Sequence, residues 1–294
     1  MPIEKPWLIL LCYWFGPWPD WMNFFVESCK WNPGVRWRIH TDCSEPENKA
    51  DNISYVPVSF ADYKALVRDR LGIAFDPSSP EKLSDVRPAF GFLHEQDTAG
   101  FPFFGWGDLD VVYGDIARFY GPRQFANVDV VSTHPERLSG HFTVLRNIPS
   151  LRRAFEEIPD YRGFLESPHQ LGVEENHFHQ VFLRSRAFRR ASFIERHSTV
   201  LSTRGWHDGT MNYPQRWFWR RGHLTNERDG SRDFLYLHFM RWKSTRWINN
   251  PPLPGEGAWV GRKFIDADWR RAATEGFCIS PAGFTSIGAT SAID

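Results

Sequence analysis

The stretch that decides the fold is Phe101-Pro-Phe-Phe-Gly-Trp-Gly-Asp108-Leu-Asp110-Val-Val-Tyr-Gly114-Asp115-Ile. An apolar run leads into two carboxylates one residue apart, and a second apolar run follows. In a strand, residues of like parity point to one face, so Asp108 and Asp110 can project together while Leu109 packs the other way. Two unpaired carboxylates are costly beside a buried strand, and a divalent cation removes both the desolvation cost and the repulsion. We therefore expect a Mg²⁺ or Mn²⁺ site that holds a diphosphate at the end of a central strand.

A second Asp-x-Asp pair, Asp266-Ala-Asp268, shows that the motif alone does not predict a metal site. No apolar strand precedes that pair and arginines follow it, so we interpret it as a solvated surface. For Asp108 and Asp110 the simpler alternative is a turn at a strand end with both acids in water. The apolar runs on either side favour the metal site.

The composition limits the class of protein. The chain has 294 residues, 41% hydrophobic and 16% aromatic, enough for one large domain or one domain with an appendage. Lys+Arg and Asp+Glu are both 35, so no overall positive charge draws the chain to nucleic acid, and we expect no nucleic-acid partner. The four cysteines form no Cys-x-x-Cys pair, and Cys12 and Cys29 lie in apolar patterns as small hydrophobic residues. A reduced, cytoplasmic setting is the simplest interpretation.

The N-terminal part predicts an α/β sheet. The apolar run from Trp7 to Phe15 is too short to span a bilayer and is typical of a buried parallel strand. Asp20 is placed as the N-cap of a helix that closes at Asn32-Pro33-Gly34. Strands at 35–41 and 53–60 and a helix at 62–71, stopped by Gly72, follow. This order predicts a sheet that binds ligands at the carboxyl ends of its strands.

Later segments continue the alternation of strands and helices. Asp115 is expected to cap a short helix at 116–120. We expect further strands at 126–133, after the loop around His141, and at 234–239, and further helices at 149–157 and 174–184.

Several motifs in a fixed order resemble those of bacterial glycosyltransferases of the GT-A class. They are Tyr13-Trp-Phe-Gly at a strand end, Thr41-Asp42, Lys82-Leu-Ser-Asp85-x-Arg87-Pro, the Asp108–Asp110 block and His238-Phe-x-x-Trp-Lys243. The chain is most similar to a little-characterised group of polysaccharide-biosynthesis transferases, and more distantly to the lipopolysaccharide galactosyltransferase and glycogenin group. The resemblance covers most of residues 7–245. It implies a Rossmann-like, mixed but mainly parallel sheet flanked by helices in residues 1–250, with a C-terminal extension of uncertain structure at 251–294.

The resemblance also implies the roles of the metal and diphosphate ligands. Asp108 and Asp110 would hold the metal of a nucleotide-sugar diphosphate, His238 would be the third protein ligand, and Lys243 would meet the diphosphate. The chain departs from the distant relatives, because Lys243 comes sooner after the histidine and no proline follows it. The alternatives are a core histidine and a surface lysine packed on Trp242 or Trp247. An imidazole ligand would favour Mn²⁺ over Mg²⁺.

The donor would be a nucleotide sugar, with a UDP-sugar favoured. By the same resemblance Tyr13, Phe15 and Asp42 would border its base and ribose, and Arg87 would reach it from the neighbouring helix.

The acceptor side has three candidate catalytic residues, Glu174, Glu175 and His141. An inverting transferase needs a carboxylate base near the acceptor hydroxyl, whereas a retaining one can rely on the leaving phosphate and on dipoles. The two glutamates open an expected helix, where acids also serve the helix dipole. The sequence therefore leaves the stereochemical course open.

Tryptophan and arginine are enriched between Trp206 and Trp247. These residues can form core, a wall on which sugars stack, or a surface that rests on a membrane presenting a lipid-linked acceptor. Core packing is the default for most of the tryptophans.

The expected function is metal-dependent transfer of a sugar to a glycan or lipid-linked acceptor. The location would be cytoplasmic, with contact to the inner face of the plasma membrane as an open alternative. A metal-dependent phosphoesterase would use the same acids, but such two-metal sites want more carboxylates or histidines. A non-catalytic carbohydrate-binding protein would account for the aromatic residues but not for the acid pair.

Overall fold

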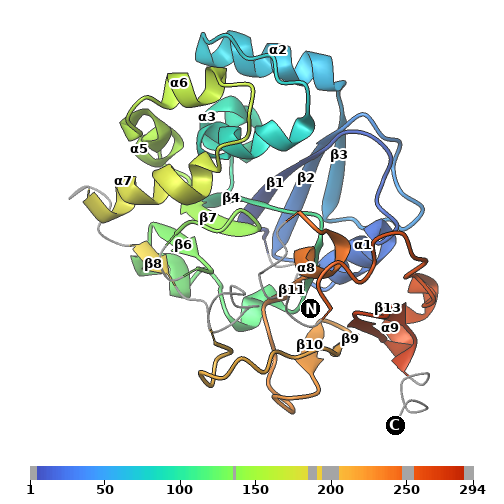
Figure 1. Ribbon diagram of the computed structural model, residues 1–294. Coiled ribbons are helices and arrows are strands. Elements are labelled where there is room, and N and C mark those ends of the chain that lie inside the picture. Colours follow the sequence, from blue (N-terminus) through green and yellow to red (C-terminus); the bar gives the residue numbers. More distant parts are fainter. Residues whose placement is uncertain (1–4, 135–136, 185–190, 194–204, 247–254, 288–294) are drawn as a thin grey trace.

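A computed structural model describes residues 5–134, 137–184, 191–193, 205–246 and 255–287. Seven strands form the main sheet in the order β3-β2-β1-β4-β7-β6-β8 (Figure 1). Pairing is parallel between β3 and β2, β2 and β1, β1 and β4, and β6 and β8, whereas β7 runs antiparallel to both β4 and β6. The strands are β1 (Leu8–Trp14), β2 (Val35–Thr41), β3 (Ile53–Pro57), β4 (Phe103–Gly107), β6 (Val130–Ser132), β7 (Phe142–Arg146) and β8 (Ala191–Phe193). The prediction of an α/β fold with a mixed, mainly parallel sheet is confirmed.

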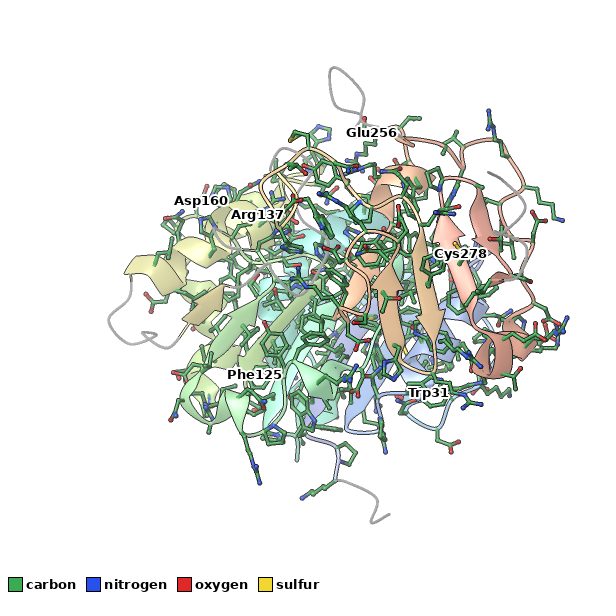
Figure 2. The ribbon with its side chains drawn as sticks, turned by 90° about the horizontal axis from the view of Figure 1, so that it is seen from below. Trp31, Phe125, Arg137, Asp160, Glu256 and Cys278 are labelled. Atoms are coloured by element: carbon green, nitrogen blue, oxygen red, sulfur yellow. The ribbon has the colours of Figure 1, made fainter. Side chains whose placement is uncertain are left out.

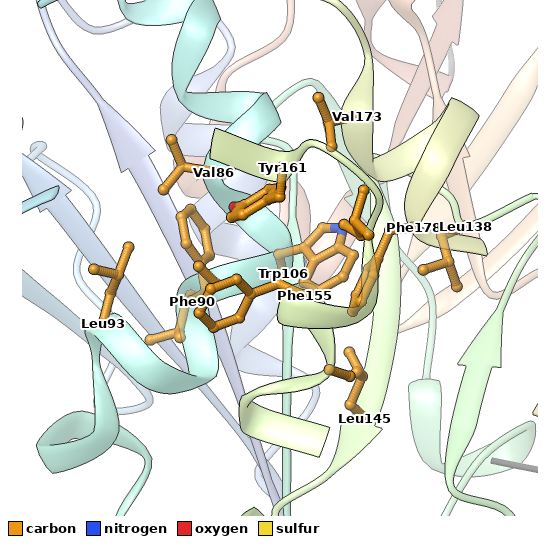
Figure 3. Close-up of a cluster of buried hydrophobic side chains, with 14 of the residues drawn as sticks. Val86, Phe90, Leu93, Trp106, Leu138, Leu145, Phe155, Tyr161, Val173 and Phe178 are labelled. Carbon is orange, nitrogen blue, oxygen red and sulfur yellow. The ribbon is translucent and has the colours of Figure 1, made fainter. Parts of the chain in front are cut away.

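Both faces of the main sheet are buried, which explains why β1 is apolar throughout. Ile9 and Leu11 belong to one core cluster, and Leu8, Leu10 and Cys12 belong to a second on the opposite face. Figure 3 shows the first cluster, in which helices cover the sheet. These helices are α2 (Phe60–Leu71), α3 (Phe90–Leu93), α5 (Pro149–Arg152), α6 (Tyr161–Glu166) and α7 (His179–Arg184), with the 3₁₀ segments η1 (Pro80–Ala89) and η4 (Ala154–Glu157). The helix α1 (Met22–Lys30) covers the opposite face.

Local signals explain both ends of α2 and the start of η2, and one prediction is corrected at α1. The Ser59 hydroxyl accepts a hydrogen bond from the Asp62 N–H at the start of α2, and Gly72 ends this helix with φ of 63°. Asp115 caps η2 (Ile116–Arg118) as predicted. The prediction that Asp20 caps α1 is wrong, because Trp21 holds the N-cap position and no side chain caps the helix.

A second, antiparallel sheet lies against the outer side of α1. Its order is β10-β9-β12-β13, with bounds β9 (Trp217–Arg220), β10 (His223–Asn226), β12 (Phe277–Ser280) and β13 (Gly283–Thr285). The Phe24 ring of α1 packs against Phe277 and Phe284, with ring centroids 4.9 and 4.7 Å apart. The sheet therefore crosses the expected boundary at residue 250, and α1 is enclosed between two sheets.

Short elements complete the described chain. They are α4 (Glu95–Thr98), β5 (Val111–Tyr113), η3 (Gln124–Asn127), η5 (Glu174–Phe178), β11 (Tyr236–His238), α8 (Met240–Lys243), η6 (Trp269–Arg271) and α9 (Ala272–Glu275). In this part of the chain, no helix has both the length and the apolar character that crossing a membrane requires. All four cysteines are free, and Cys12 and Cys29 are buried among apolar side chains, as predicted. Trp247 lies outside the described residues.

Candidate functional site

The two aspartates of the central motif lie in a bend, not within a strand. Asp108 directly follows β4, the middle strand of the main sheet, and Leu109 and Asp110 form a bend that leads into β5. The indole N–H of Trp21 donates a hydrogen bond of 2.9 Å to the Leu109 carbonyl, and the Leu109 side chain is buried in the core. The prediction that strand alternation points Asp108 and Asp110 to one side is therefore wrong. The anchored bend brings both carboxylates to one cavity.

The late histidine reaches the motif through a pair of short strands. β11 pairs antiparallel with β5 and places His238 opposite Val111. As a result the His238 Nε2 atom lies 3.1 Å from Asp110 Oδ2. The helix α8 then turns Lys243 back, so that its Nζ atom is 3.0 Å from the same oxygen. Both residues thus contact Asp110 although more than 120 residues separate them from it along the chain.

His141 also lies close to Asp108 and His238. Ligand atoms of Asp108, His141 and His238 all lie within 4.8 Å of one another. The imidazole rings of His141 and His238 are stacked, with centroids 4.1 Å apart. The Nε2 atom of His141 is buried without a hydrogen-bond partner in the described structure. This grouping of a carboxylate and two imidazoles could hold one divalent cation.

The pKa shifts of Asp110 and His141 suit metal ligands. Burial alone would raise the pKa of Asp110, but Lys243 and His238 outweigh it and hold this pKa well below its usual value. Burial, reinforced by the charge of His238, lowers the pKa of His141 well below the usual value, so this ring is neutral. Burial alone would lower the pKa of His238, but the charge of Asp110 outweighs it and raises this pKa above its usual value. Neutral imidazole and ionised carboxylate are the forms that bind metals. Imidazole ligands favour Mn²⁺ over Mg²⁺.

Arg87 connects Asp108 to Gly140 and Glu174 on another side of the cavity. Its Nη1 atom donates to the Gly140 carbonyl at 2.9 Å and lies 3.3 Å from Glu174 Oε1. Its Nη2 atom contacts Asp108 and lies 3.4 Å from the Tyr13 hydroxyl. Burial raises the pKa of Asp108 despite this guanidinium. The arginine, which η1 supplies, is thus a fixed cation beside the first aspartate.

The two glutamates of η5 differ in environment. Glu174 is buried, and burial raises its pKa to about 8, so its carboxyl is mostly protonated at neutral pH. Glu175 is partly exposed and its Oε2 atom pairs with Arg137 Nη1 at 2.9 Å. A protonated Glu174 can donate a hydrogen bond, whereas a general base at neutral pH needs an ionised group.

These residues surround one cavity of about 910 Å³. All predicted site residues line it except Asp42. Asp42 instead accepts a hydrogen bond of 2.9 Å from the Gly16 N–H and so connects the end of β2 to the turn after β1. Figure 2 shows two further residues of the cavity wall, Arg137 and Glu256, on the side of the molecule away from Trp31 and Phe125.

Comparison with known families gives one match. A family model described as a family of unknown function (DUF6625) matches residues 10–261. The chain belongs to this family. No curated protein matches the chain. The range that matches DUF6625 contains every predicted site residue, whereas β12 and β13 of the second sheet lie beyond it.

The segment rich in tryptophan and arginine, for which core, a sugar-stacking wall and a membrane surface were the alternatives, contributes to the cavity wall. Aromatic residues form one side of it, and Trp206, Trp217 and Trp242 also belong to the buried cluster of the second sheet. The default of core packing is confirmed for these three tryptophans, which line the cavity as well. Arg137 carried no signal in the sequence, because only the tertiary fold brings it to Glu175.

Proposed function

We propose that this chain is a GT-A glycosyltransferase that moves a sugar from a nucleotide-sugar donor, a UDP-sugar by preference, to a glycan or lipid-linked acceptor in cell-surface polysaccharide synthesis. The observation that carries the proposal is the convergence of Asp108, Asp110, His141 and His238 with Lys243 in one cavity at the carboxyl end of the central strand. Ligands bind at this edge of open α/β sheets. The cavity volume of about 910 Å³ is at the upper end of the range for small-molecule sites, roughly 300–1,000 Å³.

The chemistry assigns each group a task. Asp108, Asp110, His141 and His238 would hold Mn²⁺ or Mg²⁺, which supplies positive charge to the diphosphate when bound. Lys243, 3.0 Å from Asp110, can turn to the departing diphosphate and neutralise the charge that develops there. Arg87 beside Asp108 keeps this carboxylate oriented.

The remaining wall would receive the sugars. Tyr13 and Phe15 line the donor side, and Trp206, Tyr213 and Trp217 supply flat apolar faces on which sugar rings stack. Glu175 would act on the acceptor hydroxyl as base, since the buried Glu174 is mostly protonated at neutral pH. The enzyme would work in the cytoplasm, at the inner face of the plasma membrane if its acceptor is lipid-linked.

Donor binding gives the first test. Thermal shift of the purified chain is measured with UDP-, GDP- and TDP-sugars, each with Mn²⁺ and with chelator. We expect stabilisation by one nucleotide class only when Mn²⁺ is present. Asp110→Ala should lose this response and still unfold cooperatively. Equal stabilisation of Asp110→Ala and the unaltered chain would refute the assignment of the site.

One observation favours a second candidate, a metal-dependent phosphoesterase. His141 joins the expected ligands and makes the donor set richer in histidine than the sequence alone suggested. Product analysis separates the two functions. A phosphoesterase releases phosphate or nucleotide at the same rate with and without a glycan acceptor, whereas a transferase forms a new glycoside and depends on the acceptor.

A further inference from the structure

A second group of metal-ligating side chains lies between β2 and the junction of α3 and α4. His40, His94 and Asp97 place ligand atoms within 4.8 Å of one another, and none of the three is part of the wall of the large cavity. Both histidines are about 95% buried, and the Asp97 side chain is 19% exposed. The group therefore belongs to a different part of the fold from Asp108 and Asp110.

The two imidazoles meet at a single carboxylate oxygen. The His40 Nε2 atom lies 3.3 Å and the His94 Nδ1 atom 3.5 Å from Asp97 Oδ2. Both distances are long for a charge-assisted hydrogen bond, which spans about 2.7–2.9 Å. Tetrahedral Zn²⁺ with bonds of about 2.0–2.1 Å separates its ligand atoms by about 3.3–3.4 Å. These two distances thus fit two edges of a zinc coordination shell better than they fit charge-assisted hydrogen bonds, and the ligand atoms of His40 and His94 lie within 4.8 Å of each other.

Neighbouring groups hold His94 and Asp97 in this arrangement. The Tyr63 hydroxyl lies 2.8 Å from His94 Nε2, the ring atom opposite the one that faces Asp97. Arg38 Nε is 3.0 Å from Asp97 Oδ1 and leaves Oδ2 to the histidines. Such contacts to the far atoms of ligands are typical of metal sites, where they fix the ring tautomer and the carboxylate direction.

The two imidazoles also lie next to each other. The ring centroids of His40 and His94 are 4.2 Å apart, and both rings contact Asp97 Oδ2.

We propose that His40, His94 and Asp97 form a second metal site that takes Zn²⁺, with water as the fourth ligand. Two imidazoles and one carboxylate suit zinc better than Mg²⁺, and the partial exposure of Asp97 admits the water. Bound zinc joins β2 to the segment that follows η1. The site does not depend on the proposed transferase activity.

The test is a zinc titration of the full chain after chelator treatment, followed by calorimetry and thermal unfolding. Asp97→Asn keeps the side-chain shape and should weaken the binding of one zinc ion about tenfold or more. Tyr63→Phe should weaken the binding of the same ion about tenfold. The matched control is Asp69→Asn, an exposed acid of α2, which should bind zinc as the unaltered chain does. Far-UV circular dichroism checks the folding of each variant.

Cross-controls keep the two metal sites apart. Asp110→Ala should still bind the zinc ion that Asp97→Asn no longer binds. Asp97→Asn should keep the Mn²⁺-dependent response to nucleotides. If Asp97→Asn and Tyr63→Phe bind zinc with the stoichiometry and affinity of Asp69→Asn, the proposed site is wrong. The same holds if the only zinc equivalent disappears in Asp110→Ala.

Discussion

The buried carboxyl of Glu174 predicts a specific dependence of stability on pH. Its side chain is 3% exposed, its Oε2 atom has no hydrogen-bond partner among the described residues, and Arg87 Nη1 is 3.3 Å from Oε1. Burial raises its pKa from 4.5 to about 8, against the opposing charge of Arg87. The folded state therefore binds the proton more tightly than the unfolded state does, and the free energy of unfolding falls as pH rises from about 4.5 to about 8.

The magnitude follows from the pKa difference. Each pH unit between the two values changes the free energy of unfolding by about 1.4 kcal/mol, so the full effect of Glu174 is about 5 kcal/mol at most. Glu174→Gln replaces the protonated acid by a neutral group of the same shape and removes this contribution to the pH dependence. The stability advantage of the unaltered chain over this variant should therefore shrink by up to about 3 kcal/mol between about pH 5.5 and pH 7.5.

Urea unfolding at several pH values, without added metal, measures this difference. Glu156→Gln is the matched control, because its carboxylate is exposed and pairs with Arg153. We expect this control to follow the pH profile of the unaltered chain. A constant difference between the unaltered chain and Glu174→Gln over the same pH range would refute the argument that burial controls this carboxyl.

Three further predictions concern the site and the sheet. Lys243→Met should weaken Mn²⁺-dependent binding of a nucleoside diphosphate about tenfold, because one charge contact is lost. Calorimetry measures this affinity, and an unchanged value would refute the prediction. Asp110→Asn should lose most of the Mn²⁺ affinity, measured in the same experiment without nucleotide, and unaltered affinity would exclude it as a ligand. Gly105→Ala should lower the free energy of unfolding by about 1–3 kcal/mol or more, because its Cβ would lie 2.1 Å from the Thr143 carbonyl oxygen. Gly121→Ala, which would meet only the flexible end of a side chain at 3.3 Å, is its control, and equal urea midpoints would contradict the packing argument.

Signals that act over short distances made most of the main sheet predictable. The apolar run of β1 and the strand at 35–41 have the expected bounds within a residue or two, because both faces of the sheet are buried. The serine and glycine at the ends of α2 act within one helical turn. The acids after β4 could be singled out because an apolar strand precedes them.

Contacts between distant segments explain what the sequence did not predict. His141 comes close to Asp108 and His238 because β7 pairs antiparallel with β4, a pairing that the loop around the histidine did not indicate. The tail after residue 250 supplies strands to the second sheet, since Phe277 and Phe284 find their partner in α1. His40 and Asp97 likewise meet only after β2 and α4 have packed.

The pairing of β11 with β5 has a consequence for how the protein matures. Asp110 leaves the ribosome 128 residues before His238, its contact in the finished molecule. During that interval a nascent chain carries the acid pair without the imidazole and the ammonium that contact it later. Under the proposed function, the complete set of cation ligands therefore forms late, when β11 docks against β5, and binding of the proposed cation would mark completed folding of this part of the molecule.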